Sequence, residues 1–400
     1  MESMRKSLLH ALGLRQQTLP VKLQSKVLCF GDELCDDILR SVSFHGCVLL
    51  FGGRQSGKTT TLRNIAHRLA QKNREQQTPQ IRLPVFVDLM RLPYDAKPPD
   101  FFAYLARLSG DACEEHFTQI RVEKSYAGRV TGLESFETAI CKVRSCALNA
   151  DVRFVFLLDE TKRIIGDRFP RGFHDNLFHV LFGASAIQGV CNIVFAGAQE
   201  LYRLCEDDTS PIGSRAAKHC LTNLPPDAIG HMAEVMVGTL DRGKIKLLVD
   251  EVCSWTGGHA GLSAGLLRAL ADRISVDAGG VQEAVRDFRK ERSELFQIWA
   301  NSLTIEARVI HDVLLERGRL TVAEIVEHLR RNALVVHRCD RVVDELQYVG
   351  VARRDGDYLV SVIRCTPKSP SSTFARLTRP NSNVRCGRSL SKPRSASAGW

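Results

Sequence analysis

The chain has 400 residues, of which 44% are hydrophobic and 25% charged, an ordinary composition for a globular protein with two or three domains. No run approaches the roughly 20 consecutive apolar residues of a membrane-spanning helix, and the apolar run near the N-terminus is too short for a secretory signal. The 13 cysteines include no CxxC pair, which favours reduced thiols over a zinc site. We therefore expect a cytoplasmic protein with no membrane partner.

The formal net charge of +10 is unevenly distributed along the chain. Residues 364–400 contain eight basic residues and no acidic residue, so only about +2 falls on residues 1–363. This tail is rich in Ser, Pro and Asn and lacks hydrophobic periodicity, which is typical of a disordered segment. It is interpreted either as a native disordered arm or as a frameshifted or truncated C-terminus.

After an irregular or partly helical leader over residues 1–30, residues 31–225 show the pattern of an α/β core. Helices are expected at 31–40, 59–72, 101–108 and 133–148, and strands at 47–51, 84–89, 153–158 and 191–196. The expected strands are apolar throughout, and strands of that kind are typical of a parallel sheet that helices cover on both faces.

The first expected strand runs directly into Gly52-Gly-Arg-Gln-Ser-Gly57-Lys58-Thr59, which fits the phosphate-binding pattern G-x-x-x-x-G-K-[ST]. Glycines allow the tight turn, and backbone N–H groups at the start of the next helix attract phosphate oxygens. We expect Lys58 at the β- and γ-phosphates of ATP and the Thr59 hydroxyl on Mg²⁺. The residues expected to contact the nucleotide are Gly52, Gly53, Arg54, Gln55, Ser56, Gly57, Lys58, Thr59 and Thr60.

The third expected strand ends in two carboxylates, Asp159 and Glu160. A hydrophobic strand with this ending is typical of the second half of a P-loop site, in which Asp159 would hold Mg²⁺ and Glu160 would act as the general base for the attacking water. The pair favours ATP hydrolysis over binding alone. The alternative is that both carboxylates only cap the next helix.

Two further residues are candidates for contacting the γ-phosphate. Gln199 follows the fourth strand and would sense the phosphate from the strand end, with a solvated helix start as the alternative. Arg215, in Ser210-Pro-Ile-Gly-Ser-Arg215, would act as an arginine finger within its own chain or toward a neighbour. For Arg215 the alternative is an exposed structural arginine.

Beyond residue 225 no further strand is expected until the hairpin. Residues 226–303 are expected to form a helical lid, with helices at 229–240, 245–256, 262–274 and 281–303. Residues 304–363 then predict three helices, at 305–316, 321–331 and 336–349, and a hairpin over 350–362. Asp355-Gly356 supplies the turn of the hairpin. Three helices followed by a hairpin form the winged-helix pattern.

In this order the segments resemble the P-loop ATPases of the AAA+/STAND group, which includes archaeal-type ATPases, origin-recognition-type initiators and NACHT and NB-ARC relatives. The resemblance spans roughly residues 30–362. It rests on Gly52–Thr60, Phe154–Glu160, Ser210–Arg215 and Trp255-Thr-Gly-Gly-His259-Ala-Gly-Leu262. It implies a P-loop sheet with a helical lid and a winged helix, ATP and Mg²⁺ as cofactors, and domain movements that follow the nucleotide, often with homo-oligomerisation.

The resemblance also implies that His259 lies near the adenine and ribose of the nucleotide. Ala260 stands where the relatives have proline, which removes the reason for a rigid turn at that point. The alternative is that His259 is a structural residue at the start of a helix.

Two functions fit these predictions. The first is an ATP-binding and ATP-hydrolysing molecular switch in regulation or defence signalling, with an unidentified protein partner. The second is a DNA-binding initiator or loader, whose winged helix would place residues 336–349 in the major groove of duplex DNA and the hairpin at the minor groove. The basic residues of that region are Arg330, Arg331, Arg338, Arg341, Arg353 and Arg354, diluted by Asp340, Asp344, Glu345, Asp355 and Asp357.

Two other assignments are less well supported by the sequence. A kinase would need an acceptor-substrate pocket, for which no motif is evident. No N-K-x-D motif for guanine recognition is present, which favours ATP over GTP.

Overall fold

A computed structural model describes residues 32–75, 80–117, 122, 124–147, 150–183, 186–206, 210–237, 242–271, 278–291, 303–334 and 339–362. The expected leader and basic tail lie outside these residues, as does Arg338. None of the helices in the described ranges is long and apolar enough to cross a membrane.

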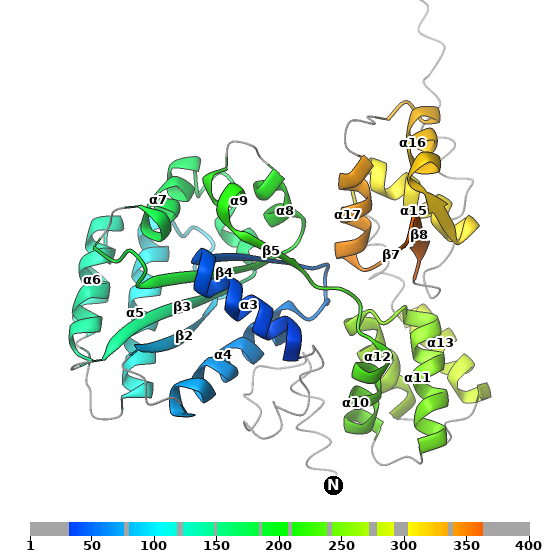
Figure 1. The fold of residues 1–400 in the computed structure, drawn as a ribbon, viewed down its shortest axis with the longest axis horizontal. Coiled ribbons are helices and arrows are strands. Elements are labelled where there is room, and N and C mark those ends of the chain that lie inside the picture. The colour runs from blue at the N-terminus through cyan, green and yellow to red at the C-terminus, as the bar shows by residue number, and fades with distance from the viewer. Residues whose placement is uncertain are drawn as a thin grey trace, which may run out of the picture. The chain divides into compact units, whose positions relative to one another are not determined.

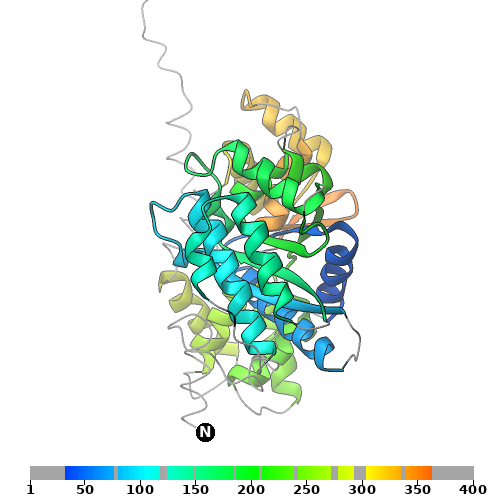
Figure 2. The same cartoon turned by 90° about the vertical axis from the view of Figure 1, so that its left-hand side faces the viewer.

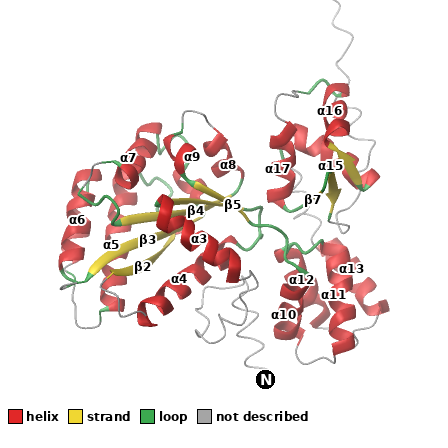
Figure 3. Cartoon of the chain, viewed as in Figure 1, coloured by secondary structure: helices red, strands yellow, loops and turns green. Residues whose placement is uncertain are grey.

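The core of the fold is a five-stranded sheet with the order β2-β3-β4-β1-β5, and all of its neighbouring strands are parallel (Figure 3). The strands are β1 (Cys47–Phe51), β2 (Gln80–Asp88), β3 (Asp151–Asp159), β4 (Cys191–Gly197) and β5 (Ala217–Cys220). The expected parallel α/β sheet is confirmed. The sequence missed β5, because this four-residue edge strand alternates half-buried and exposed residues and so contains no apolar run.

Helices cover both faces of the sheet (Figures 1 and 2). One layer contains α3 (Asp32–His45) and α4 (Lys58–Glu75). The other contains α5 (Pro98–His116), α6 (Leu133–Ser145), α7 (Arg171–Phe182), α8 (Gln199–Glu206) and α9 (Pro211–Arg215), with the 3₁₀ helices η1 (Leu89–Arg91), η2 (Lys124–Arg129) and η3 (Thr161–Ile164) between elements. The helices before β2 and those after it lie on opposite faces of the sheet. Crossovers between parallel strands are right-handed, and the direction in which the chain moves across the sheet reverses at β2.

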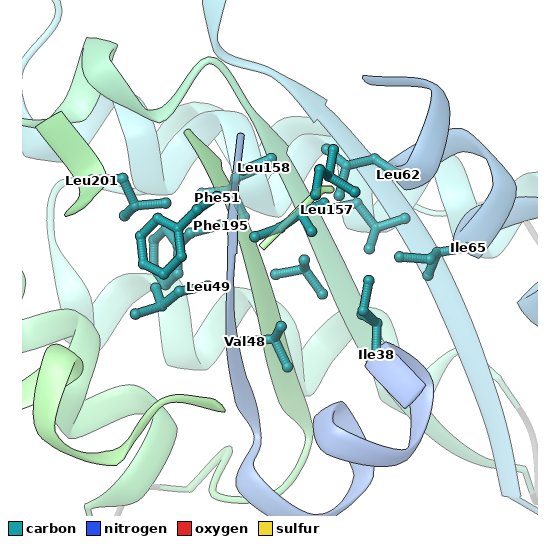
Figure 4. Packing of buried hydrophobic residues seen from close by; sticks show 14 of the residues in the cluster. Ile38, Val48, Leu49, Phe51, Leu62, Ile65, Leu157, Leu158, Phe195 and Leu201 are labelled. Carbon is teal, nitrogen blue, oxygen red and sulfur yellow. The ribbon is translucent and has the colours of Figure 1, made fainter. Parts of the chain in front are cut away.

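The strand β1, which lies between β4 and β5, is buried on both of its faces (Figure 4). Val48 points toward Ile38 of α3 and Leu62 of α4, whereas Leu49 points to the opposite face, where Leu201 of α8 lies. Successive side chains of a strand alternate between the faces, so an apolar run such as this one fills two cores at once. This packing fixes the end of β1, from which the glycine-rich loop starts.

Four helices follow the sheet: α10 (Pro226–Val237), α11 (Arg242–Thr256), α12 (Ala260–Ala271) and α13 (Ala278–Glu291). Helix α11 ends at two glycines with left-handed backbone angles, Gly257 at φ 59° and Gly258 at φ 82°. A Cβ atom on Gly258 would lie 2.3 Å from the carbonyl oxygen of Leu224, so only glycine fits there. The start of α12 is thereby held against the segment that leaves the sheet.

Residues 303–362, here called the helix–hairpin module, contain α15 (Ile305–Arg317), α16 (Val322–Arg331) and α17 (Cys339–Val349). Their sheet has the order β6-β8-β7 and is antiparallel, with β6 (Arg319–Thr321), β7 (Ala352–Asp355) and β8 (Tyr358–Ser361). The expected three helices and hairpin are present. The strand β6 was not expected, because its three residues are too few to produce a periodic pattern.

Candidate functional site

The loop between β1 and α4 lies at the carboxyl ends of the parallel strands. Gly57, at φ 99°, and Gln55, at φ 60°, have left-handed backbone angles, and α4 begins at Lys58 directly after them. A Cβ atom on Gly52 would lie 2.3 Å from Oγ of Ser56, so the loop closes tightly. The Ser56 hydroxyl is buried without a hydrogen-bond partner. A loop with this geometry at a helix N-terminus, holding an unsatisfied buried hydroxyl, fits a bound phosphate chain.

Lys58 lies folded back over this loop. Its Nζ donates to the carbonyl oxygen of Gly52 at 2.9 Å and to that of Gly53 at 2.6 Å. Burial lowers the pKa of Lys58 from its ordinary value, while the nearby carboxylates of Glu160 and Asp159 act in the opposite direction. A phosphate in the loop would offer this ammonium group a stronger, charged acceptor than the two carbonyls.

Thr59 and Asp159 bring two oxygen ligands together. The Thr59 hydroxyl donates to Oδ2 of Asp159 at 2.6 Å, and Asp159 is only 7% exposed. Burial is the main cause that raises the pKa of Asp159, opposed by the hydrogen bond from Thr59. A hydroxyl and a carboxylate are ligands of the kind that Mg²⁺ takes together with phosphate oxygens, so the pair fits that ion.

Glu160 follows directly after β3 in an unusual backbone conformation, at φ 58°. Its backbone N–H donates to Oδ1 of Asp159 at 3.1 Å, and its carboxylate lies 3.2 Å from Nζ of Lys162. Although Glu160 precedes η3, its side chain makes no capping hydrogen bond. A capping role therefore does not explain Glu160, and a left-handed non-glycine residue of this kind is typical of sites where function fixes the backbone.

Strand register places Gln199 and Arg215 at opposite ends of the sheet. Gly197 pairs with the last residue of β1, so Gln199 lies beside the loop, where it begins α8. Ala217 pairs with Val48 near the start of β1, and Arg215 lies two residues before it. At roughly 3.3 Å per residue the strand separates Arg215 from the loop of its own chain by more than 10 Å.

The guanidinium group of Arg215 has a different neighbour, because it lies 5.5 Å from the ring centroid of Phe178 on α7. As an arginine finger, Arg215 would contact a phosphate either in its own chain or in a neighbouring molecule. Its position does not fit the first of these two contacts. A contact toward a neighbouring molecule stays a prediction.

His259 lies next to the loop and also at a helix start. It is 1% exposed, and burial together with the charge of Lys58 lowers its pKa to about 4, opposed by hydrogen bonding with the backbone of Arg54. Its Nδ1 accepts the N–H of Leu262 in the first turn of α12. A Cβ atom on Gly261 would lie 2.5 Å from Cβ of Gln55, which shows how closely α12 approaches the loop. The two readings of His259 from the sequence are therefore compatible.

The helix–hairpin module contributes residues to this site that sequence reasoning missed. The N–H of Gly53 donates to the carbonyl oxygen of Tyr348 at 2.6 Å, and Nε2 of Gln199 donates to Oε1 of Glu345 at 3.2 Å. A Cβ atom on Gly350 would lie 2.9 Å from the His259 ring. Glu345, Tyr348 and Gly350 are here called the α17 contact.

The sequence predicts that Glu345 is an acidic residue that dilutes the basic charge of a DNA-binding surface. It is instead 6% exposed and does not belong to the outer surface of the module. The only signal in the sequence was a charged residue within an apolar helical stripe, between Val342, Val343 and Leu346.

Two solved structures share the fold of this chain. The Walker-type ATPase of Pyrococcus abyssi aligns over 84% of this chain and 93% of its own, with a TM-score of 0.56 and 13% sequence identity. The ADPNP–ADP complexes of the Aeropyrum pernix ORC2 protein align over 90% of this chain and 94% of their own, with a TM-score of 0.51 and 13% identity. The chain thus shares the P-loop NTPase fold of these two structures. No protein-family model and no curated protein matches the sequence.

Proposed function

We propose that this chain binds ATP with Mg²⁺ and hydrolyses it, and that the nucleotide state sets the position of the helix–hairpin module. The observation that carries the proposal is the meeting of Thr59 with Asp159, 2.6 Å apart, beside an ammonium group that lies over the phosphate loop. The distance between these residues in the sequence is large, so their contact is not a consequence of the local motif. Gly52 to Thr60 would hold the phosphates.

Each residue of the site has one task in this reaction. Lys58 would exchange its two carbonyl partners for oxygens of the β- and γ-phosphates, and Thr59 and Asp159 would hold Mg²⁺, which neutralises phosphate charge when bound. Glu160 would give up its ion pair with Lys162, orient a water molecule and accept a proton from that water. Gln199, at the neighbouring strand end, would contact the γ-phosphate, and His259 would contact the nucleoside.

The proposal assigns residues 31–225 to the ATPase core, 226–303 to the lid and 304–363 to a winged helix. Its switching partner would be an unidentified protein, in a regulatory or defence pathway. The position of Arg215 at the far end of the sheet supports a role toward a second copy of the chain, which would make hydrolysis depend on nucleotide-dependent homo-oligomerisation.

Duplex DNA is the alternative partner, and one observation favours the hairpin over α17 as the element that contacts it. Arg353 and Arg354 are exposed on β7, and the guanidinium group of Arg319 lies 4.8 Å from the exposed ring of Tyr358. Helix α17 is mostly buried and exposes acidic side chains, so it is not free to enter a groove in this conformation.

ATP binding is tested with Lys58→Ala, with Lys72→Ala on the same helix as the control. Lys72 forms only an exposed ion pair with Asp36, at 3.5 Å. We expect Lys58→Ala to weaken binding of a fluorescent ATP analogue at least about hundredfold, because it removes a charge-assisted contact, and the control to bind as the unchanged chain does. Equal binding by both variants would refute the site.

The DNA alternative is tested with a chain that ends at residue 363 and with the double variant Arg353→Ala, Arg354→Ala. If the module binds duplex DNA, the shortened chain retains binding, and the double variant lowers the salt slope of log K by about two. Loss of binding with the tail alone would assign the attraction to residues 364–400 and remove the hairpin as a reader.

A further inference from the structure

One carboxylate of the module joins two segments that are far apart in the sequence. Glu345 is 6% exposed and accepts hydrogen bonds from Nε2 of Gln199 at 3.2 Å, from the N–H of Thr304 at 2.8 Å and from the Thr304 hydroxyl at 2.7 Å. Hydrogen bonds to a buried charged group are among the stronger ones in proteins, and removing a donor leaves that charge without compensation. Glu345 therefore holds both partners firmly.

The two partners of Glu345 have different places in the fold. Thr304 is the N-cap of α15, where its hydroxyl also accepts the N–H of Ala307 at 3.2 Å, so it fixes the beginning of the module. Gln199 is the first residue of α8 and follows the strand that pairs with β1, beside the phosphate loop. A single side chain thus links the start of the module to the strand end that faces the nucleotide.

The contact around Glu345 continues onto the loop itself. Tyr202 of α8 lies 5.8 Å from Phe51 and 5.2 Å from Tyr348, measured between ring centroids, and Tyr348 accepts the N–H of Gly53. These contacts are apolar or involve backbone atoms, so they do not distinguish one nucleotide from another. The hydrogen bond between Gln199 and Glu345 is different, because in the proposed function its donor also contacts the γ-phosphate.

We infer that Glu345 is a positioning residue that couples the γ-phosphate to the helix–hairpin module through Gln199. The inference rests on the proposed function, in which Gln199 contacts that phosphate. A γ-phosphate oxygen competes with Glu345 for the Gln199 amide, and its negative charge also disfavours the buried carboxylate nearby. Binding of ATP then loosens the hold on Thr304 and α17, and loss of the γ-phosphate restores it.

The pairing is tested first without nucleotide, in the full chain. Backbone hydrogen exchange of residues 342–349 and 304–310 is measured in Glu345→Gln, in Gln199→Ala and in the double variant. We expect each single change to speed exchange about tenfold. We expect the double variant to add less than twofold to Glu345→Gln, because the neutral amide has already lost the charge that strengthens the bond to Gln199. Additive effects would overturn the pairing.

Asp344→Asn provides the matched control, since Asp344 is the neighbouring acidic residue of α17 and accepts a hydrogen bond from the Tyr202 hydroxyl at the surface, at 3.3 Å. In Asp344→Asn, we expect backbone hydrogen exchange of residues 342–349 and 304–310 to stay within about twofold of that in the unchanged chain. An effect as large as that of Glu345→Gln would show that any change in α17 loosens the module, and would overturn a special role for Glu345.

The coupling is tested next with Mg-ADPNP and Mg-ADP, with binding followed separately by a fluorescent analogue. We expect ADPNP, but not ADP, to speed exchange of residues 342–349 at least about fivefold, and Gln199→Ala to remove this difference. If ADPNP binds and exchange is the same with both nucleotides, the coupling is wrong while the proposed binding stands. If neither nucleotide binds, the proposed function fails and the coupling fails with it. The two single variants and the double variant, measured without nucleotide, still decide whether the Gln199–Glu345 pair holds the module.

Discussion

The phosphate loop and the α17 contact meet at the same end of the sheet but differ in how the sequence produces them. The loop is one continuous segment, Gly52–Thr60, whose glycines and helix start determine its shape locally. The α17 contact depends on Glu345, Tyr348 and Gly350, which are brought to the loop only by packing over a long sequence separation. In the proposed function, the loop supplies the chemistry and the α17 contact responds to it.

The largest effect that separates the two regions is expected from Gly52→Ala. The new Cβ would lie 2.3 Å from Oγ and 3.2 Å from Cβ of Ser56, so the Ser56 side chain must shift within the loop that would hold the phosphates. We expect the dissociation constant for ATP to rise at least about hundredfold, roughly 3 kcal/mol, with little change in exchange of α17. A titration with a fluorescent ATP analogue checks the first result, and loosening of α17 by the same change would show that the two regions are not separable.

Acid is expected to lower the free energy of unfolding through His259, which lies between the phosphate loop and the α17 contact. Its pKa is about 4 in the folded chain and 6.5 ordinarily, so between these values the unfolded chain binds a proton that the folded chain does not. The contribution of His259 to stability is therefore complete above pH 6.5 and is lost as the pH falls toward 4, by roughly 3 kcal/mol in total.

Denaturant unfolding across that pH range measures this loss, with His259→Gln as the test variant. We expect the free energy of unfolding to depend less steeply on pH in His259→Gln than in the unchanged chain. His311 of α15 is also buried with its pKa lowered to about 4, so we expect His311→Gln to give a similarly shallower dependence at a position away from the loop. Identical slopes for His259→Gln and the unchanged chain would show that His259 is protonated in the folded state.

A smaller effect, confined to the α17 contact, is expected from Gly350→Ala. Gly350 has a left-handed backbone at φ 85°, and a Cβ atom there would lie 2.8 Å from Oδ1 of Asn223. We expect a loss of about 2 kcal/mol in the free energy of unfolding, from strain and lost packing. The control is Gly356→Ala in the hairpin turn, where the backbone is also left-handed but no atom lies near the added Cβ. Equal losses would assign the effect to the backbone angle alone.

The smallest effect is expected from Tyr202→Phe. The hydroxyl donates to Oδ2 of Asp344 at the surface, at 3.3 Å, while the ring keeps its contacts with Phe51 and Tyr348. We expect a change of at most about 0.5 kcal/mol in denaturant unfolding, because exposed hydrogen bonds contribute little. A loss above 1.5 kcal/mol would mean that the hydroxyl, and not the ring, holds the α17 contact.

The sequence predicted those parts of the molecule whose information is local. The strand before the loop, the loop itself and the apolar strand that ends at Asp159 were expected at the places where they are found, because periodicity and glycine placement act over a few residues. Helices α7 and α9 were not expected, and α8 was considered only as the helix-start alternative for Gln199.

The contact between Glu345 and Gln199 could not be predicted for a different reason. The sequence marks each residue separately, Gln199 after a strand and Glu345 within an apolar helical stripe. Their pairing follows only from the way α17 packs beside α8. The same limit applies to Arg215, whose distance from the loop became apparent only from the strand register. The segments 1–30 and 364–400 lie outside the described residues, so the expectations for them stay predictions.

The central claim is that the site at the carboxyl ends of the parallel strands hydrolyses ATP. It is tested most directly by Glu160→Gln under single-turnover conditions. The substitution keeps the size of the side chain and removes the carboxylate that we propose as the general base, directly after Asp159. We predict that the variant binds ATP as tightly as the unchanged chain does, within about threefold, and releases phosphate at least about hundredfold more slowly. Phosphate release at the unchanged rate would contradict the account.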